Sequence, residues 1–324
     1  MRRTGGRESA TRTASGGSGQ SGRDPSLRPA RSKRGKPDLV PASAEAPLAA
    51  GLYLVATPIG NLGDITVRGL AVLRGADRIW CEDTRVTVRL LARYGIATPL
   101  DAYHDHNAER VRPAILAALR RGERVALVSD AGMPLVSDPG YKLVRAAHAE
   151  GLPVTAVPGA SAALTGLILS GLPPDRFLFA GFLPPRAAAR RRAVAAWVAL
   201  DATLVFFEAP SRLAACLADL CEVLGERPAA VARELTKLHE EVRRGRLGEL
   251  AAHYRAAGPP RGEAVVIVGP PEPAVPDAAE IDRRLRAALV GRGVREAAAE
   301  LAAATGLPRT ALYRRALALR QERG

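Results

Sequence analysis

The chain has 324 residues, 47% of them hydrophobic, which suffices for a sizeable core and about two domains with extensions. Its formal net charge of +14 is unusual for an enzyme of small metabolites and indicates a polyanionic partner, of which nucleic acid is the first candidate. The alternative is a generally basic surface without such a partner. Cys81, Cys216 and Cys221 form no CxxC pair, which excludes a disulfide framework and favours a cytoplasmic location, and no stretch approaches the ~18 apolar residues of a membrane span.

Residues 1–48 are predicted to form a disordered basic tail. They carry eight Arg and two Lys against two Asp and two Glu, among many Ser, Gly and Pro. Apolar residues are too sparse there to offset the entropy lost on ordering. Such a tail can attract nucleic acid non-specifically; a dispensable segment, or a true start further downstream, are the alternatives.

Residues 49–172 are predicted to form an N-terminal α/β domain. The apolar run 52–56 ends in a turn with Pro58 and Gly60, which is typical of a buried strand that delivers a loop to a sheet's carboxyl edge. Similar strand-and-loop units and helices alternate after it, which indicates a mostly parallel sheet whose carboxyl edge binds a ligand. The further strand units are 78–85, 125–140 and 154–162, and the helices are 67–73, 85–94, 111–121, 141–150 and 161–169.

Residues 173–272 are predicted to form a second α/β domain, after a Gly-Leu-Pro-Pro linker at 171–174. Its strands are expected at 177–182, 203–210, 229–235 and 263–269, with helices at 187–200 and 211–223.

Residues 273–324 are predicted to be a linker and a helix-turn-helix-like extension, helical over 280–322. Ala302, Gly306 and Leu312 occupy the small, turn and core positions of that motif. Three arginines, Arg309, Arg314 and Arg315, would project from its second helix. A hairpin that serves only for packing is the alternative.

The familiar cofactor motifs are missing. No GxGxxG opens a helix and no GxxxxGK[ST] occurs, which disfavours nicotinamide binding and P-loop hydrolysis. His104 and His106 flank Asp105 but have no third ligand at a recognisable spacing, so we expect no metal. Ser161 lacks a nucleophile elbow and is better explained as a helix N-cap or as a hydroxyl that contacts a ligand.

The remaining candidate site is a cleft of glycine-rich turns with few charges. Such turns suit a zwitterionic, nucleoside-like ligand better than a triphosphate, which would require clustered Lys and Arg. The residues that would offer amides, hydroxyls and carboxylates are Asp130, Gly132, Ser137, Asp138, Gly140, Pro158, Gly159 and Ser161.

Eight motifs occur in a recognisable order: TPIGNLGDIT from 57, CEDTR from 81, HDHN from 104, LVSDAGMPLVSDPG from 127, VPGASA from 157, GLPPDRFLFAGFLPP from 171, FFEAPSR from 206 and ARELTKLHEE from 232. With this series, residues 51–270 resemble the tetrapyrrole-methylase superfamily, and more narrowly its 16S rRNA (cytidine 2′-O)-methyltransferases. The terminal helices are similar to the extension of that branch. Met133, where Thr is expected, and Ala160, where Pro is usual, are mild departures.

The resemblance implies S-adenosylmethionine (SAM) bound in a cleft between two α/β domains. It also implies a homodimer that acts on 16S rRNA or the small ribosomal subunit. The implied cofactor residues are Pro58, Gly60, Asp130, Ala131, Gly132, Met133, Ser137, Pro158, Gly159, Ala160, Ser161, Phe207, Glu208, Leu235, Thr236 and Ala264.

Methyl transfer to a ribose hydroxyl depends on positioning and on removal of the hydroxyl proton. Asp83, Arg85, His106 and Lys237 are the catalytic candidates, with Glu82 and Glu208 nearby. Arg85 could bind phosphate or hold Asp83, and Lys237 could be a base only if burial lowered its pKa; phosphate binding is its alternative. Two basic clusters would contact RNA: Arg186, Arg190, Arg191 and Arg192, and Arg243, Arg244 and Arg246.

Two other functions stay open. A methylase of a tetrapyrrole or another small molecule would leave the net charge of +14 unexplained. A ligand-sensing DNA-binding regulator would leave the polar CEDTR, HDHN and RELTK motifs without a role.

Overall fold

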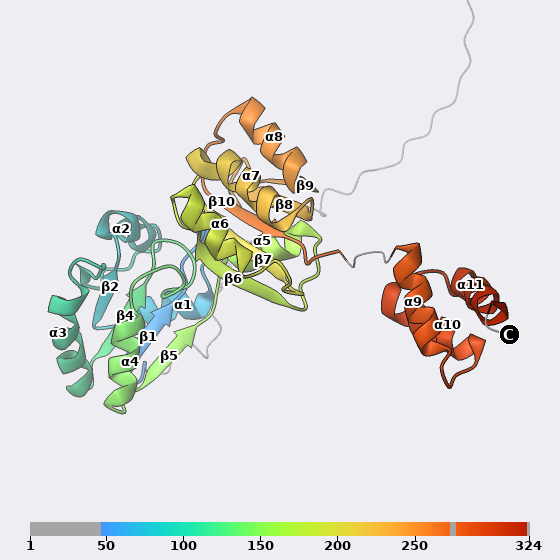
Figure 1. The fold of residues 1–324 in the computed structure, drawn as a ribbon. Helices are drawn as coiled ribbons and strands as arrows, with labels where there is room; N and C mark the ends of the chain where they lie inside the picture. Colours follow the sequence, from blue (N-terminus) through green and yellow to red (C-terminus); the bar gives the residue numbers. More distant parts are fainter. Residues whose placement is uncertain (1–46, 273–276, 323–324) are drawn as a thin grey trace, which may run out of the picture. The chain divides into compact units, whose positions relative to one another are not determined.

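The computed structural model describes residues 47–272 and 277–322, and the predicted tail over 1–48 lies almost wholly outside this range. The chain forms two five-stranded sheets with their helices, followed by three helices near the C-terminus, which confirms the predicted fold class (Figure 1). Within the described residues, no helix is long and apolar enough to cross a membrane.

The first sheet is entirely parallel, whereas a mostly parallel sheet was predicted. Its strands are β1 (Gly51–Val55), β2 (Arg78–Cys81), β3 (Leu100–Ala102), β4 (Arg124–Val128) and β5 (Val154–Val157), in the order β3-β2-β4-β1-β5. The short strand β3 was not expected from the sequence, because three residues give too little periodicity. Since all five strands run the same way, their carboxyl ends and the loops that follow lie at one edge.

Helices cover both faces of this sheet. Side chains of α1 (Val67–Gly75) and α2 (Thr84–Arg93) pack in one apolar core, and those of α3 (Ala108–Arg120) and α4 (Tyr141–Ala149) pack in another. Burial on both faces explains why the strands are continuous apolar runs. The first two helices have side-chain N-caps: Thr66 accepts from the Gly69 N–H at 2.9 Å, and Asp83 accepts from the Arg85 N–H at 2.8 Å.

The second sheet is mostly antiparallel. Its strands are β6 (Phe177–Phe182), β7 (Thr203–Glu208), β8 (Pro228–Arg233), β9 (Glu241–Arg246) and β10 (Ala264–Val268), in the order β6-β7-β10-β8-β9. Only β6 and β7 are parallel neighbours. The sequence did not predict β9, whose Arg-rich residues suggest a surface cluster instead.

Helices α6 (Ala187–Ala195), α7 (Leu213–Leu224) and α8 (Leu247–Ala257) share an apolar core with one face of the second sheet. Helix α6 is shorter than the predicted helix 187–200. The opposite face packs against α5 (Ala162–Ser170) through Ala163 and Leu167. Gly166 permits this contact, because a Cβ there would lie 3.2 Å from the Val265 side chain.

The C-terminal helices α9 (Ala278–Ala288), α10 (Val294–Thr305) and α11 (Arg309–Gln321) have their own apolar core. Gly306 ends α10 in the left-handed conformation, and Leu312 is buried. The predicted helix-turn-helix geometry over α10 and α11 is therefore confirmed. Arg315 does not project freely, because its Nε donates to Asp282 Oδ1 of α9 at 2.6 Å.

Candidate functional site

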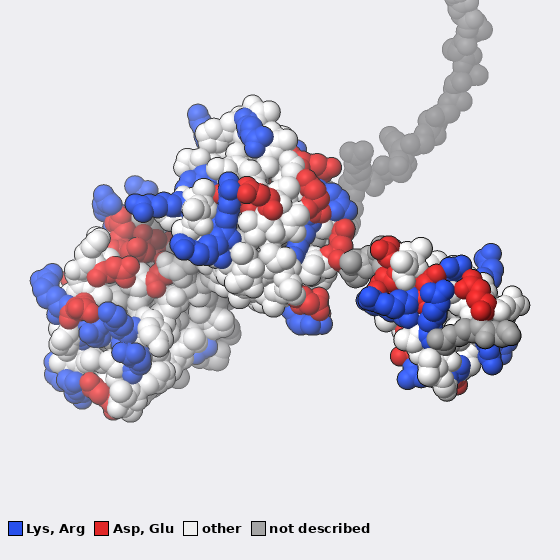
Figure 2. All heavy atoms as spheres, viewed as in Figure 1, with Lys and Arg blue, Asp and Glu red and all other residues white. Residues whose placement is uncertain are grey.

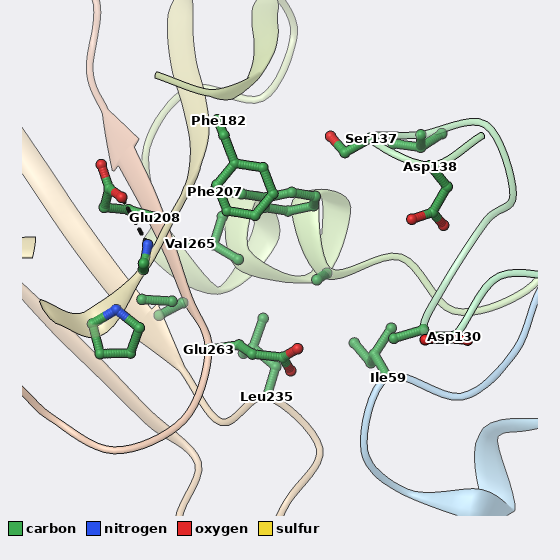
Figure 3. Close-up of a pocket in the computed structure, with 17 residues that line it drawn as sticks. Ile59, Asp130, Ser137, Asp138, Phe182, Phe207, Glu208, Leu235, Glu263 and Val265 are labelled. Atoms are coloured by element: carbon green, nitrogen blue, oxygen red, sulfur yellow. Dashed lines mark hydrogen bonds between the residues drawn. The ribbon is translucent and has the colours of Figure 1, made fainter. Parts of the chain in front are cut away.

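A cavity of about 400 Å³ is lined by residues from both α/β regions. The first region contributes loop residues that follow the carboxyl ends of β1 and β4, including Ile59, Asp130 and Asp138. The second contributes strand and helix residues, including Phe207 and Val265. Figure 3 shows these two groups on opposite sides of the cavity. The cavity is therefore built at the ligand-binding edge that the parallel sheet predicts.

The loop after β4 is held by its own backbone. Thr57 and Gly132 pair through reciprocal backbone hydrogen bonds of 2.9 and 3.0 Å. The Thr57 hydroxyl donates to the Ser129 carbonyl at 3.0 Å, and the Ser129 hydroxyl donates to the Gly132 carbonyl at 2.8 Å. Leu135 and Ser137 have backbone φ angles of 72° and 66°, which residues other than Gly rarely adopt. Such strain persists where surrounding contacts determine the conformation, so this loop presents its polar groups in a fixed arrangement.

The opposite wall is apolar. Phe207 of β7 packs edge-to-face against Phe179 and Phe182 of β6, at ring-centroid distances of 4.9 and 5.6 Å. Val265 of β10 and Ala162 at the start of α5 extend this wall. It offers shape and apolar contact instead of hydrogen bonds.

The charged residues that line the cavity are all acidic. They are Asp130, Asp138, Glu208 and Glu263, and none of the described lining residues is Lys or Arg. Glu208 is fully buried, and its Oε1 forms an ion pair with Arg212 Nη2 at 2.5 Å. Burial and the nearby Glu82 carboxyl raise the pKa of Asp138 to about 7. A cavity of this composition favours a cationic ligand over an anionic one.

Seven of the predicted cofactor residues line the cavity, and the other nine do not. The lining residues are Asp130, Ala131, Ser137, Phe207, Glu208, Leu235 and Ala264. The other nine are Pro58, Gly60, Gly132, Met133, Pro158, Gly159, Ala160, Ser161 and Thr236.

Several of these nine shape the loops around the cavity. The Thr236 hydroxyl accepts from the Asn61 N–H at 3.1 Å, and so joins the first loop to the segment after β8. Gly60 packs closely against the Lys237 side chain, because a Cβ at position 60 would lie only 2.5 Å from Lys237 Cγ. Ser161 is the N-cap of α5, where its hydroxyl accepts from the Leu164 N–H at 3.4 Å, as predicted.

Among the catalytic candidates, Asp83 and Arg85 form a pair. Arg85 Nη2 lies 2.6 Å from Asp83 Oδ2, while Asp83 also caps α2. Hydrogen bonds from Arg85 lower the pKa of Asp83 to about 2. The Asp83 N–H donates to Asp130 Oδ1 at 3.0 Å, which links the pair to the cavity. The Arg85 side chain is 84% exposed and accessible to a large substrate.

Lys237 and His106 occupy different environments. Burial lowers the pKa of Lys237, but hydrogen bonds to Glu234 at 2.8 Å and Glu263 at 3.1 Å outweigh it and leave the pKa raised. Lys237 is therefore a cation, and the condition under which it could be a base is not met. His106 is exposed, with its ring centroid 6.0 Å from that of His104. No group of three or more His, Cys, Asp or Glu in the described residues is arranged to hold a metal.

Several cavity residues were not predicted as cofactor contacts. Asp138 was predicted as a polar residue of the cleft but not as a cofactor contact, and Val136 of the same motif was not predicted. Phe182, Ala162, Val265 and Glu263 depend on how α5 and the second sheet pack. Apolar alternation identifies Phe182 and Val265 as strand residues but does not tell which face meets a ligand.

The basic clusters are less free than the sequence suggests. The prediction that Arg190 lies on an RNA-contacting surface is wrong: it is 3% exposed, and its Nε donates to Asp219 at 2.8 Å. Arg191 also pairs with Asp219, and Arg244 donates to the Ser170 carbonyl at 3.0 Å. Arg186 and Arg192 are exposed. Figure 2 shows basic and acidic side chains interspersed over the face in view, not one continuous basic surface.

Two family models match the chain. The model described as "Tetrapyrrole (Corrin/Porphyrin) Methylases" matches residues 51–251, and the model described as "RsmI C-terminal HTH domain" matches residues 275–320.

Three curated relatives share the name ribosomal RNA small subunit methyltransferase I. The relative from Mesorhizobium japonicum is 53% identical over 279 residues, which cover 86% of this chain and 95% of the relative. The relative from Erythrobacter litoralis is 54% identical, with 86% and 98% covered, and that from Micromonospora olivasterospora is 50% identical, with 81% and 85% covered.

Solved structures show the same fold. A diphthine synthase superposes with a TM-score of 0.54 at 18% identity, covering 67% of this chain and 89% of its own. A cobalt precorrin-4 methyltransferase of cobalamin biosynthesis gives a TM-score of 0.51 at 20% identity, covering 71% and 98%. The parallel sheet, the cavity at its carboxyl edge and the family match agree: the chain belongs to the tetrapyrrole (corrin/porphyrin) methylase family.

Proposed function

We propose that this protein is a SAM-dependent methyltransferase that methylates the 2′-hydroxyl of a cytidine in 16S ribosomal RNA. The observation that carries the proposal is the identity of about half of the aligned residues to proteins named ribosomal RNA small subunit methyltransferase I, over nearly their whole length. The match of residues 275–320 to the helix-turn-helix model supports the same branch of the family.

The cavity fits SAM in its chemistry. Bound SAM would supply a methyl group on a positively charged sulfonium. Asp130, Asp138 and Glu263 provide negative charge around the cavity, and the apolar wall at Phe207 and Val265 suits a nucleoside. A triphosphate would meet only acidic charge there.

In this proposal the chain holds and orients its two substrates. The strained loop with Ala131 and Ser137 and the wall with Phe207, Leu235 and Ala264 would hold the cofactor. The other predicted cofactor residues would shape the loops beside it. A fixed arrangement contributes to rate because correctly placed reactants need no further ordering.

We propose roles in binding and positioning for the four catalytic candidates. Arg85, which is exposed next to the cavity residue Asp130, is suited to bind an RNA phosphate while Asp83 orients it. Lys237 would hold Glu263 at the cavity rather than accept a proton. His106 would contact RNA from the exposed loop after β3.

We also propose that small-subunit rRNA is recognised by exposed arginines, and that the protein acts as a homodimer in the cytoplasm. Arg309 and Arg314 on α11 and Arg186 and Arg192 around α6 are exposed, and such side chains bind phosphates without reading sequence. Leu164 and Ile168 of α5 are 49% and 71% exposed, which suits burial against a second copy. The three cysteines of the sequence are free thiols, as expected in a reducing compartment.

The test is methyl transfer from labelled SAM to small ribosomal subunits, and to naked 16S rRNA, from a strain that lacks the modification. Digestion to nucleosides should place the label on a cytidine ribose. Calorimetry measures SAM binding separately. SAM binding without label on RNA would favour a small-molecule acceptor, and failure to bind SAM would contradict the methyltransferase proposal.

A cavity-filling variant tests where SAM binds. Ala162→Phe adds a ring inside the cavity and should raise the Kd for SAM about tenfold or more, corresponding to about 1.4 kcal/mol. Ala149→Phe, at an exposed position near the end of α4, is the matched control and should bind SAM as the wild type does. Equal Kd values for both variants would place SAM elsewhere.

A further inference from the structure

Two carboxyl groups meet at the edge of the cavity. Glu82 directly follows β2, and Asp138 lies in the strained loop after β4, where the Glu82 carboxyl is close enough to raise the pKa of Asp138. Asp138 lines the cavity, and Figure 3 shows its carboxyl group on the same side as Asp130. Because β2 and β4 are parallel neighbours, their carboxyl ends bring the two acids together.

One oxygen of the Asp138 carboxyl group lacks a hydrogen-bond partner. Its Oδ2 is fully buried and makes no hydrogen bond. The nearby Ser129 has one hydroxyl proton, which it donates to the Gly132 carbonyl at 2.8 Å. A buried carboxyl oxygen without a donor is satisfied when a proton is placed on it or on its neighbour.

The surrounding charges favour proton uptake. Asp130 faces both carboxyls, and Asp105 faces Glu82; these charges oppose ionisation. His104 favours the ionised form of Glu82, but its effect ranks below burial and Asp130. Burial first, and Glu82 second, raise the pKa of Asp138 to about 7, while burial raises the pKa of Glu82.

Three other candidates, Asp83, Lys237 and Glu208, are already held in ion pairs. Asp83 receives three hydrogen bonds from the Arg85 side chain and one from its backbone. Lys237 is held as a cation by Glu234 and Glu263. Glu208 is fully buried against Arg212. Among the acidic cavity residues, Asp138 combines access to the cavity with a proton affinity matched to neutral pH.

We propose that Asp138 accepts the proton of the ribose 2′-hydroxyl, and that Glu82 is a positioning residue that shares this proton. The inference rests on the proposed function. As the hydroxyl oxygen bonds to the methyl carbon, the carbon–sulfur bond breaks and its electron pair goes to sulfur. The hydroxyl proton passes to the Asp138 carboxylate and then leaves to solvent, so the acceptor becomes a neutral ether.

The main test is Asp138→Asn, which keeps the size of the side chain and removes its basicity. Transfer under saturating SAM should fall about 10²- to 10⁴-fold while the Kd for SAM stays within about threefold. The wild-type rate should rise with pH through a midpoint near 7, and the residual rate of the variant should lose this step. Glu150→Gln, a carboxyl paired with Arg120 outside the cavity lining, is the control and should keep the wild-type rate and profile.

A second variant separates this role from a structural one. Glu82→Gln removes the neighbouring charge, so it should move the midpoint of the pH–rate profile below that of the wild type without removing the step. It also provides a readout if Asp138→Asn does not fold, as judged by circular dichroism. An Asp138→Asn rate above half of the wild-type rate, or an unmoved midpoint in Glu82→Gln, would overturn the inference. If the wild-type protein transfers no methyl group to ribose, the proposed function itself is wrong. Failure of the proposed function can therefore be distinguished from failure of the proposed role of Asp138.

Discussion

The two sheets of this protein differ in direction and in what they give to the cavity. The first is wholly parallel, so the loops after its strands gather at one edge and contribute Asp130, Ser137 and Asp138. The second has only one parallel pair and contributes mainly apolar side chains, among them Phe207 and Val265, together with Glu208 and Glu263. The loops after the parallel strands thus form a polar side of the cavity, whereas the second sheet supplies most of its apolar surface.

The largest expected effect concerns the strained loop of the first region. Gly140 has a φ of 136°, and an added Cβ would lie 2.8 Å from Leu135 and 3.0 Å from Leu127. Gly140→Ala should therefore lower the free energy of unfolding by about 3 kcal/mol and weaken SAM binding. Gly151→Ala is the matched control. Gly151 has a φ of 66°, and no atom lies within 4 Å of an added Cβ, so this variant should lose only about 1 kcal/mol of unfolding free energy. Equal losses in urea unfolding would mean that the loop is not tightly constrained.

The next effect concerns the second region, whose core holds an ion pair. Arg190 and Asp219 have side chains only 4% and 7% exposed. Arg190→Met leaves a buried carboxylate with fewer donors and should cost about 3 kcal/mol or slightly less, because Arg191 still pairs with Asp219. Arg192→Met, at an exposed neighbouring position, should change stability by less than about 0.5 kcal/mol. The Kd for SAM, measured well below the unfolding temperature, should not change in either variant, since neither residue lines the cavity.

The smallest effect concerns the amino edge of the first sheet. Hydrogen bonds from Arg124 lower the pKa of Asp77 to about 2. Since the folded pKa lies below the ordinary value of 3.8, the pair stabilises the protein above pH 4, and this stabilisation is lost as the pH falls through about 2. Asp77→Asn should cost less than about 1 kcal/mol at pH 7, because both side chains are about one third exposed, and still less at pH 2, where the carboxyl is about half protonated. A cost that does not depend on pH would show that packing, not charge, holds Asp77.

The sequence predicts the first region better than the second. Strands buried on both faces are continuous apolar runs with clear turn signals, so all but the three-residue β3 could be found. In the second region, β9 escaped prediction because Arg243, Arg244 and Arg246 look like a surface cluster. Their partners, such as the Ser170 carbonyl for Arg244, are distant in sequence.

The site divides in the same way. The loop residues Asp130, Ala131 and Ser137 follow from motif and spacing, because a parallel sheet fixes where its loops end. Phe182 and Ala162 follow only from packing: α5 lies against the second sheet, and nothing local in the sequence determines this. The proton affinity of Asp138 also depends on the distant Glu82, so charge counting along the chain could not reveal it.

The acidic lining of the cavity has a consequence for inhibitor design. Phosphorylated nucleotide analogues, which suit many nucleoside-binding enzymes, would bring anions against Asp130, Asp138 and Glu263. A nucleoside that carries a fixed positive centre, such as a quaternary ammonium in place of the sulfonium, should be selected by this cavity. Its advantage over a neutral thioether analogue should grow as the pH rises through about 7, where Asp138 gains its charge.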